Sequence, residues 1–255
     1  MNEQTRIGIM GAMPEEIDGV VGLLDQVSRQ TLGGRIYYSG EINKVPVVVV
    51  FSRWGKVAAA ATVAALIHEF KITELIFTGV AGGIHPHLNI GDIVLGERLI
   101  QHDMDARPLM QQYEIPLLGQ TFFEVNAESL ARADGAVNQL LESKRLHQIF
   151  SADILAEFKM SHPRFYRGDI ASGDRFFAGH EHKVNLQTQL PTVLCVEMEG
   201  AAVAQVCFEY QIPYVVIRTI SDVADEQSHL DFPRFIKYVS SKYSVEIIKN
   251  ILSVA

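Results

Sequence analysis

The segment TVLCVEMEGAAVAQVCFEYQIPYVVIRTISD, residues 192–222, decides the fold class because it places a helix-like run between two strand-like runs. The runs at 192–199 and 214–222 are rich in Val and Ile, which favour strands. Residues 200–211 begin with small residues and fit a helix. A strand, a helix and a strand in this order indicate an α/β domain.

The same alternation runs through the rest of the chain. Further strands are predicted at 6–13, 35–42, 45–52, 74–83, 91–100 and 167–176, and helices at 14–27, 56–70, 127–146 and 231–255. Because the strands are almost continuously apolar, we expect a parallel or mixed sheet covered on both faces. The Ala-rich helix at 56–70 should be largely buried, and 103–125 should be a long loop. We predict one domain over residues 1–255.

Composition and charge narrow the classes of partner. The 255 residues carry a net charge of −8, which argues against nucleic-acid binding, because phosphate contacts need an excess of Lys and Arg. No secretory signal and no membrane-spanning apolar run is visible, so we expect a cytoplasmic protein with no membrane partner. Cys195 and Cys207 lie in apolar contexts and are expected to be buried free thiols.

Acidic side chains follow three of the predicted strands. They are Glu15 with Glu16, Glu197 with Glu199, and Asp222 with Asp225. In an open α/β sheet, ligands bind outside the carboxyl ends of the strands, so these acids should meet at one site. A ring of acids without a metal-binding pattern suits a neutral substrate or one that develops positive charge.

Each acid also has a purely structural interpretation. Glu16 favours a helix N-terminus, Glu197 or Glu199 is a candidate cap for a helix starting at Gly200, and Asp222 suits a turn or cap. Residues two apart in an extended strand point the same way, so the sequence does not say which of Glu197 and Glu199 faces a ligand. The small residues after Glu199 leave room for a ligand beside the backbone.

Other motifs point away from phosphate, metal and nucleophile chemistry. The stretch TGVAGG at 78–83, which contains Gly82, is neither a P-loop nor G-x-G-x-x-G, and we expect a tight turn beside the ligand. The pairs His85/His87 and His180/His182 lack a third ligand and are expected at the surface. G-x-S-x-G is absent. We expect no metal and no cofactor.

Six of these stretches together resemble one enzyme family. They are IGIMGAMPEEI, TGVAGGI, GDIV, SGDRFF, VEMEGAAVAQVC and VIRTISDVADEQSHLDF. In this order, from about residue 6 to 250, the chain resembles the 5'-methylthioadenosine/S-adenosylhomocysteine nucleosidases of the purine nucleoside phosphorylase-like superfamily. The resemblance implies a three-layer fold with a central twisted mixed sheet flanked by helices. It also implies a homodimer that uses water to release adenine and a 5'-thioribose.

The resemblance assigns the chemical steps to three acids. Glu16 corresponds to the acid that activates the attacking water, and Asp222 to the general acid that protonates N7 of adenine, with Ser221 and Arg218 in support. Glu199 corresponds to the residue that holds the ribose hydroxyls. Carboxylates stabilise the oxocarbenium-like sugar, and Asp222 must hold its proton near neutral pH, which burial and neighbouring carboxylates favour.

The remaining predicted contacts surround the base, the sugar and the 5' group. By resemblance, Phe176 stacks on the purine and the Phe177 backbone reads its edge. Met198 packs against the sugar, while Met13 and Phe232 line the pocket for the 5'-alkylthio group.

Three features depart from the family pattern, and all bear on the substrate pocket. Trp54 replaces a small or aliphatic residue on the 5' side, where it reshapes the pocket or, alternatively, packs on a dimer surface. Val80 replaces a frequent serine. The loop at 104–120 is atypical, and residues 105–116 of this loop usually close the pocket of the partner subunit.

Three other functions remain open. A phosphorylase of the same fold would need arginines for phosphate where Glu16 stands, and a close variant would cleave another adenine nucleoside, such as an aminodeoxyfutalosine-type substrate. A nucleoside-binding regulatory module would use the scaffold without chemistry.

Overall fold

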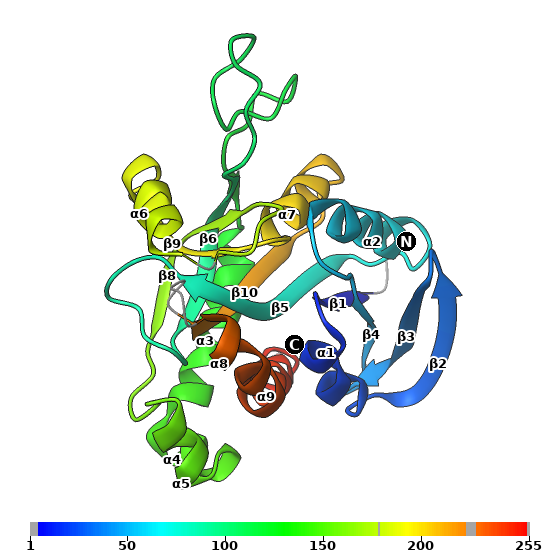
Figure 1. The fold of residues 1–255 in the computed structure, drawn as a ribbon. Coiled ribbons are helices and arrows are strands. Elements are labelled where there is room, and N and C mark those ends of the chain that lie inside the picture. Colours follow the sequence, from blue (N-terminus) through cyan, green and yellow to red (C-terminus); the bar gives the residue numbers. More distant parts are fainter. Residues whose placement is uncertain (1–4, 178, 223–227, 254–255) are drawn as a thin grey trace.

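The predicted alternation of strands and helices is present, with a mixed sheet between layers of helices (Figure 1). The computed structural model describes residues 5–177, 179–222 and 228–253. The strands are β1 (Ile7–Gly11), β2 (Asp25–Leu32), β3 (Arg35–Ile42), β4 (Val45–Phe51), β5 (Glu74–Gly83), β6 (Ile93–Gln101), β7 (Phe123–Glu124), β8 (Phe165–Ser172), β9 (Val193–Glu197) and β10 (Tyr214–Asp222). The helices are α1 (Pro14–Val21), α2 (Lys56–His68), α3 (Ala127–Leu141), α4 (Ser143–Ile149), α5 (Ala152–Glu157), α6 (His180–Gln189), α7 (Gly200–Glu209), α8 (Ser228–Phe235), a π-helical turn at Ile236–Ser240 and α9 (Ser241–Ile251).

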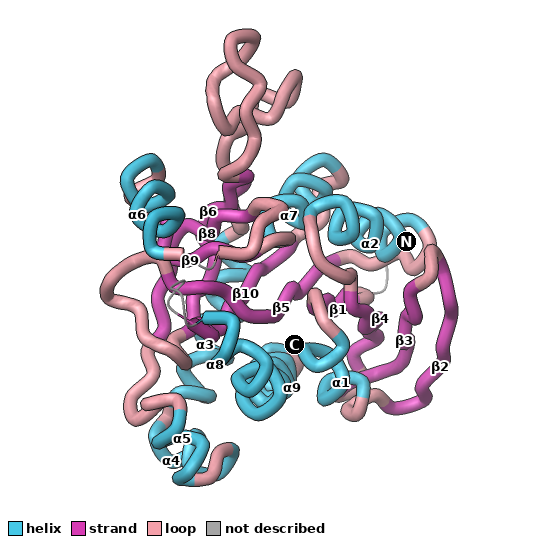
Figure 2. Tube along the Cα trace, viewed as in Figure 1, coloured by secondary structure: helices cyan, strands magenta, loops and turns pink. Residues whose placement is uncertain are grey.

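Helices cover the sheet on two sides. Helices α2 and α7 pack together on one side, and α1 and α3 pack against α9 on the other (Figure 2). The central strands are buried, as the apolar runs predicted: every residue of β1 and β10 is buried. Helix α2 is an exception to the predictions. One side of it is buried, but Val57 is 81% exposed and Ala61 is exposed, so its apolar surface extends to the outside of the chain.

One part of the sheet closes on itself. Strand β5 is parallel to β10 and antiparallel to β9, β10 is antiparallel to β6, and β6, β8 and β9 are parallel to one another in that order. The five strands therefore form a ring. On the other side of β5 the sheet stays open and continues through β1, β4, β3 and β2.

Strand β5 changes partner halfway along its length. Its first half pairs with β1, where Phe77 lies opposite Met10, and its last residues pair with β9, where Gly82 lies opposite Val196. Strand β10 follows it on the other side, from Tyr214 to Asp222. The end of β5 consequently lies where β1, β9 and β10 approach one another.

Several predicted boundaries were wrong. The helix predicted at 14–27 ends at Val21, and residues 25–32 form strand β2 instead. This strand is exposed except for half-buried Leu32 and pairs only with β3, so it has no apolar face that would mark it as a strand. The helix predicted at 127–146 breaks at Glu142, whose backbone is not helical, and the strand predicted at 167–176 ends at Ser172. The C-terminal helix is divided by the π-helical turn.

The long irregular stretch predicted at 103–125 is confirmed apart from short strand β7. It projects far from the body of the molecule (Figure 1). A single bridge between Ile115 and Gln120 is the regular pairing within it. Leu109 and Leu117 are 89% and 94% exposed, so this projection carries apolar side chains that the chain itself does not cover.

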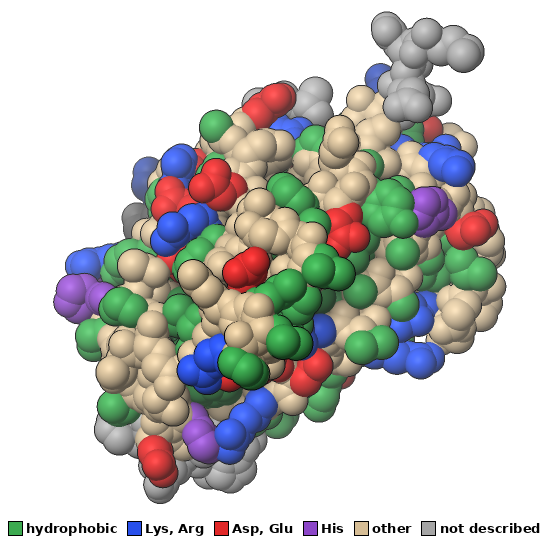
Figure 3. Space-filling model, turned by 90° about the horizontal axis from the view of Figure 1, so that it is seen from above, with side chains coloured by type: hydrophobic (Ala, Val, Ile, Leu, Met, Phe, Trp, Pro, Cys, Tyr) green, Lys and Arg blue, Asp and Glu red, His purple; other side chains and the backbone are tan. Residues whose placement is uncertain are grey.

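The surface agrees with the acidic composition. On the face seen in Figure 3, Lys and Arg side chains are scattered among acidic and hydrophobic ones instead of forming one basic patch. Cys195 and Cys207 are buried free thiols, as predicted. Within the described part of the chain, no helix combines the length and apolarity needed to cross a membrane.

Candidate active site

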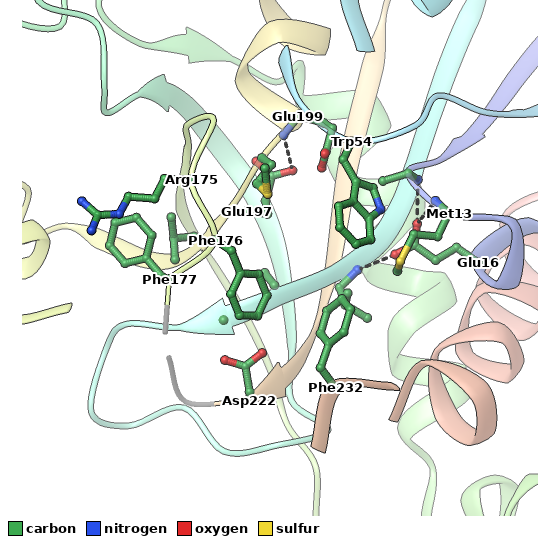
Figure 4. A pocket seen from close by; sticks show the side chains of 16 residues that line it. Met13, Glu16, Trp54, Arg175, Phe176, Phe177, Glu197, Glu199, Asp222 and Phe232 are labelled. Carbon is green, nitrogen blue, oxygen red and sulfur yellow. Dashed lines mark hydrogen bonds between the residues drawn. The ribbon is translucent and has the colours of Figure 1, made fainter. Parts of the chain in front are cut away.

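One cavity collects side chains from strand ends and loops that are far apart in the sequence (Figure 4). Its lining consists of Ala12, Met13, Glu16, Trp54, Val80, Ala81, Gly82, Arg175, Phe176, Phe177, Val196, Glu197, Met198, Glu199, Asp222 and Phe232. Of the predicted site residues, all except Glu15, Ser221 and Arg218 belong to this lining, and Glu15 is exposed. Asp225 and the His180 side chain lie outside the described residues.

The acids converge, but by a different route from the one expected for an open sheet. Strand β9 runs antiparallel to β5, so its carboxyl end is not at the same edge as those of β1 and β10. The convergence occurs along the end of β5. Val80 donates its N–H to Glu16, and Gly82 lies between Val196 of β9 and Asp222 of β10.

Glu16 is held by backbone N–H groups on both of its oxygens. Oε2 accepts from Ala12 (2.6 Å) and Met13 (3.1 Å), and Oε1 accepts from Val80 (3.2 Å). The contact with Met13 caps helix α1, so the structural interpretation of Glu16 is also correct. The side chain is 1% exposed, and this burial raises the pKa of its carboxyl group.

The glycine-rich stretch at 78–83 is strand, not the predicted tight turn. Its Gly79 serves close approach, because a Cβ atom there would lie 2.8 Å from Glu16 Oε1. The absent side chain leaves space for the Glu16 carboxylate beside β5.

Glu197 has a structural role in the cavity wall. Its carboxylate forms a buried ion pair with Arg218 (2.7 Å) and accepts N–H groups from Glu199 (3.2 Å) and Gly200 (2.8 Å), so it caps helix α7. The Ser172 hydroxyl donates to it as well. Arg218 was predicted to support Asp222, but its guanidinium donates to Glu197 and to the carbonyls of Phe77 and Ile217.

Glu199 does not point the same way as Glu197, because β9 ends at Glu197 and the backbone leaves the extended conformation. Its Oε1 accepts the N–H of Gly55 at 2.7 Å, across 144 residues of sequence. Burial and the negative charge of Glu197 raise its pKa to about 8. The two acids thus differ in role: Glu197 binds Arg218 and caps helix α7, whereas Glu199 binds the N–H of Gly55 and remains a candidate for ligand binding.

Asp222, Phe176 and Phe232 lie on the side of the cavity away from Glu199 (Figure 4). The Ser221 hydroxyl donates to Asp222 Oδ2 at 2.7 Å, and Asp222 is 4% exposed. The Phe176 ring meets the Phe232 ring edge to face at 5.8 Å. Phe177 packs into a small core cluster and its ring contacts His102, and the residue also lines the cavity.

Trp54 is the most exposed aromatic side chain of the lining, with 63% of its surface accessible. Figure 4 shows it beside Met13 and Glu16, on the side away from Arg175 and Phe177. Its neighbour Arg53 has a left-handed backbone (φ 74°) and donates to Gly34 O at 2.6 Å. The indole is therefore a solvent-exposed part of the cavity lining.

Arg175, Ala12, Ala81 and Val196 line the cavity but were not predicted. Each adjoins a predicted residue or acidic segment, and proximity in sequence was the only available signal. Histidines do not add a metal centre: His85 and His87 contact each other, and no cluster of three or more His, Cys, Asp or Glu within the described ranges is placed to hold a metal ion.

Known proteins resemble this chain in both sequence and fold. Residues 6–253 match the family model of the phosphorylase superfamily. A 5'-methylthioadenosine/S-adenosylhomocysteine nucleosidase of Glaesserella parasuis is 34% identical over 248 residues, covering 97% of this chain and 98% of that protein.

Two solved structures superpose closely. The nucleosidase of the same name from Colwellia psychrerythraea, in complex with adenine, has a TM-score of 0.85 at 29% identity and covers 98% of this chain and 96% of its own. A futalosine hydrolase of Helicobacter pylori has a TM-score of 0.83 at 30% identity and covers 99% of each chain.

The raised pKa of Glu199 predicts how stability depends on pH. An unfolded glutamate titrates near 4.5, whereas Glu199 in the folded chain titrates near 8. Between these values the folded state binds more protons, so the stabilisation that Glu199 contributes is fully present below about pH 4.5 and is lost as pH rises to about 8. We expect a higher melting temperature near pH 5 than near pH 8, and a smaller difference in Glu199→Gln.

Thermal melts at both pH values test this. Burial raises the pKa of Glu16 too, so Glu199→Gln should remove only part of the fall, by a few degrees, since 1 kcal/mol corresponds to about 2–4 °C in a chain of this size. Glu128→Gln, on the surface of α3, is the control. Equal pH dependence in both variants would contradict the assignment.

Proposed function

Because this chain belongs to the phosphorylase superfamily, we propose that it hydrolyses the N-glycosidic bond of 5'-methylthioadenosine, S-adenosylhomocysteine or both, releasing adenine and a 5'-thioribose. The observation that carries the proposal is one cavity lined by Glu16, Glu199 and Asp222, with Phe176 on the side of Asp222. The relatives bearing the nucleosidase name, one of them with bound adenine, support it over nearly the full length.

The substrate is oriented by the chemistry of the two ends. The adenine base belongs beside Asp222 and Phe176, where an aromatic ring offers a stacking surface and an acid stands near the leaving nitrogen. Protonation of N7 by Asp222 lets adenine leave as a neutral molecule, and general acid catalysis of this kind contributes about 10²- to 10⁴-fold. The Ser221 hydroxyl orients the Asp222 carboxyl group.

In the proposed complex, the ribose and the attacking water occupy the half of the cavity that contains Glu199 and Glu16. Glu199 accepts the ribose hydroxyls, and Met198 packs against the ring. As the glycosidic bond lengthens, positive charge develops on the ribose. This charge favours the ionised form of the neighbouring acids, which then stabilise it. Burial makes Glu16 a stronger base, so it accepts a proton from the water that attacks the sugar. Backbone N–H groups hold its oxygens in place for this step.

Phosphorolysis is disfavoured by the charges of the cavity. Among the described lining residues the only cation is Arg175, which lies beside Phe177, away from Glu16. A phosphate in place of the attacking water would face the acidic side chain of Glu16, and the nearby Arg218 is buried and bound to Glu197. Cleavage of another adenine nucleoside stays as the second candidate, because the futalosine hydrolase is as similar in fold as the other relatives.

We also propose that the enzyme acts as a homodimer. The projecting loop at 104–120 carries exposed Leu109 and Leu117, and Val57 is exposed at the start of α2 close to Trp54. Such uncovered apolar side chains are typical of an interface. The resemblance adds that this loop closes the partner's pocket. The expected cytoplasmic location and the single domain over 1–255 stay predictions.

A substrate panel tests the reaction. The wild-type protein is incubated with methylthioadenosine, S-adenosylhomocysteine, adenosine, deoxyadenosine and an aminodeoxyfutalosine-type nucleoside, with and without phosphate, and free adenine is measured. We expect release from a 5'-thio nucleoside at equal rates in both conditions. A requirement for phosphate would identify a phosphorylase, and tight adenine binding without turnover would identify a binding module.

Asp222→Asn tests the general acid. The amide keeps the size of the side chain but cannot supply the proton, so we expect kcat to fall by about 10²- to 10⁴-fold while adenine still binds. Steady-state kinetics and calorimetric adenine titration provide the two readouts. Asp153→Asn, on the surface of α5, is the matched control. Turnover near the wild-type rate in Asp222→Asn would refute the assignment.

Trp54→Ile tests the 5' side of the cavity. Removing the indole should change the ratio of kcat/KM between 5'-thio substrates by more than it changes the rate on the best of them, because Trp54 lies beside Met13, which is predicted to line the pocket for the 5' group. Tyr210→Ile, an exposed aromatic outside the cavity, is the control. Identical selectivity of Trp54→Ile and wild type would show that Trp54 serves another surface.

A further inference from the structure

A ring of polar contacts adjoins the Gly55 N–H group that binds Glu199. We propose that Lys56, Asp103 and Asp174 form a positioning junction that fixes this N–H group, and through it the Glu199 carboxylate, in the orientation that the ribose hydroxyls require. The inference rests on the proposed function and adds positioning residues outside the cavity lining.

The three residues of the junction contact one another in a closed ring. Lys56 Nζ donates to Asp103 Oδ1 at 2.6 Å. Asp103 Oδ2 accepts the N–H of Asp174 at 2.9 Å, and Asp174 Oδ1 accepts the N–H of Lys56 at 2.8 Å. Each member therefore restrains the other two. Because Lys56 directly follows Gly55, the ring also restrains the backbone that carries the Gly55 N–H.

The junction connects three segments that the sheet topology alone leaves separate. Lys56 is the first residue of α2, and Asp103 lies at the base of the projecting loop after β6. Asp174 follows β8 and precedes Phe176 and Phe177, which line the end of the cavity where adenine is proposed to bind. The contact with the sugar-binding acid is thereby tied to the segment that holds adenine.

Gly55 fits this arrangement because it has no side chain. Its φ is 91°, a conformation that other residues rarely adopt. A Cβ atom built on it would lie 3.0 Å from Asp174 Oδ1. The carboxylate of Asp174 thus packs directly on the residue whose N–H meets Glu199.

The charge of Asp103 persists at neutral pH. Burial acts to raise the pKa of Asp103, but hydrogen bonds from Lys56 and Asp174 outweigh it and keep that pKa below its ordinary value. The Lys56 and Asp103 side chains are only 16% and 32% exposed. Salt therefore screens this pair less than a surface pair, and Gln101 Oε1 adds a second acceptor for Lys56 at 3.1 Å.

The decisive experiment compares two substrates in the same variants. Methylthioadenosine has both ribose hydroxyls, and its 2',3'-dideoxy analogue lacks them. The quantity measured is the ratio of kcat/KM between the two. We expect Lys56→Met to lower kcat/KM for methylthioadenosine by roughly tenfold, as for one charge-assisted hydrogen bond, and to leave the dideoxy analogue unchanged. Lys56→Arg, which keeps a cation, should restore part of the ratio.

Three further variants make the result interpretable. Glu199→Gln should abolish most of the preference for hydroxyls. Asp103→Asn keeps its size but loses its charge, and it should shift the ratio in the same direction even if Lys56→Met does not fold. Lys249→Met removes a lysine from an ion pair on α9, away from the cavity, and should leave the ratio unchanged.

The two hypotheses fail in different ways. Equal losses on both substrates in Lys56→Met and Asp103→Asn, with the preference still lost in Glu199→Gln, would overturn the junction alone. A wild-type protein that releases no adenine from either substrate would overturn the proposed function and with it this inference.

Discussion

The buried ion pair between Arg218 and Glu197 is the interaction on which the site depends. The guanidinium of Arg218 on β10 lies 3.9 Å from the ring centre of Phe77 on β5 and donates to Glu197 at the end of β9. Three strands of the closed ring therefore share one charge pair. Removing one partner of such a pair costs about 3–5 kcal/mol, because the other charge stays buried without compensation. Since Glu197 also caps α7 at Gly200, the pair fixes where this helix begins.

This arrangement separates structural from chemical carboxylates. Glu197 is committed to Arg218 and the helix, while Glu199 enters the cavity beside it and has its pKa raised by burial and by Glu197. Glu16 and Glu199 both meet backbone N–H groups. Backbone donors are fixed before a substrate binds, so in the proposed reaction these acids need little rearrangement as charge develops on the sugar. The Glu197–Arg218 pair and the backbone N–H groups thus hold the cavity in place before a substrate binds.

Much of the fold was predictable because a continuous apolar run indicates a buried strand. The structure confirms that the central strands are buried. Strand β10 and helix α7 follow the pattern of residues 192–222 closely. Strand β2 was missed because it is exposed and polar, so pairing with β3, not burial, makes it a strand. The turn predicted at 78–83 was wrong because these residues continue strand β5. Gly79 is glycine because a side chain would clash with Glu16 from another element, a contact that no local pattern reveals.

The sequence by itself determined the α/β class, the buried central strands and the acids that follow three of them, because each of these depends on residues that are neighbours in the chain. Only the tertiary structure decided that β9 runs against β5, that Glu197 and Glu199 separate, and that Arg218 pairs with Glu197. It also decided that the N–H of Gly55 meets Glu199, 144 residues further along. The physical reason is that these contacts arise from strand pairing and burial between distant segments, whose geometry appears only when the sheet has closed.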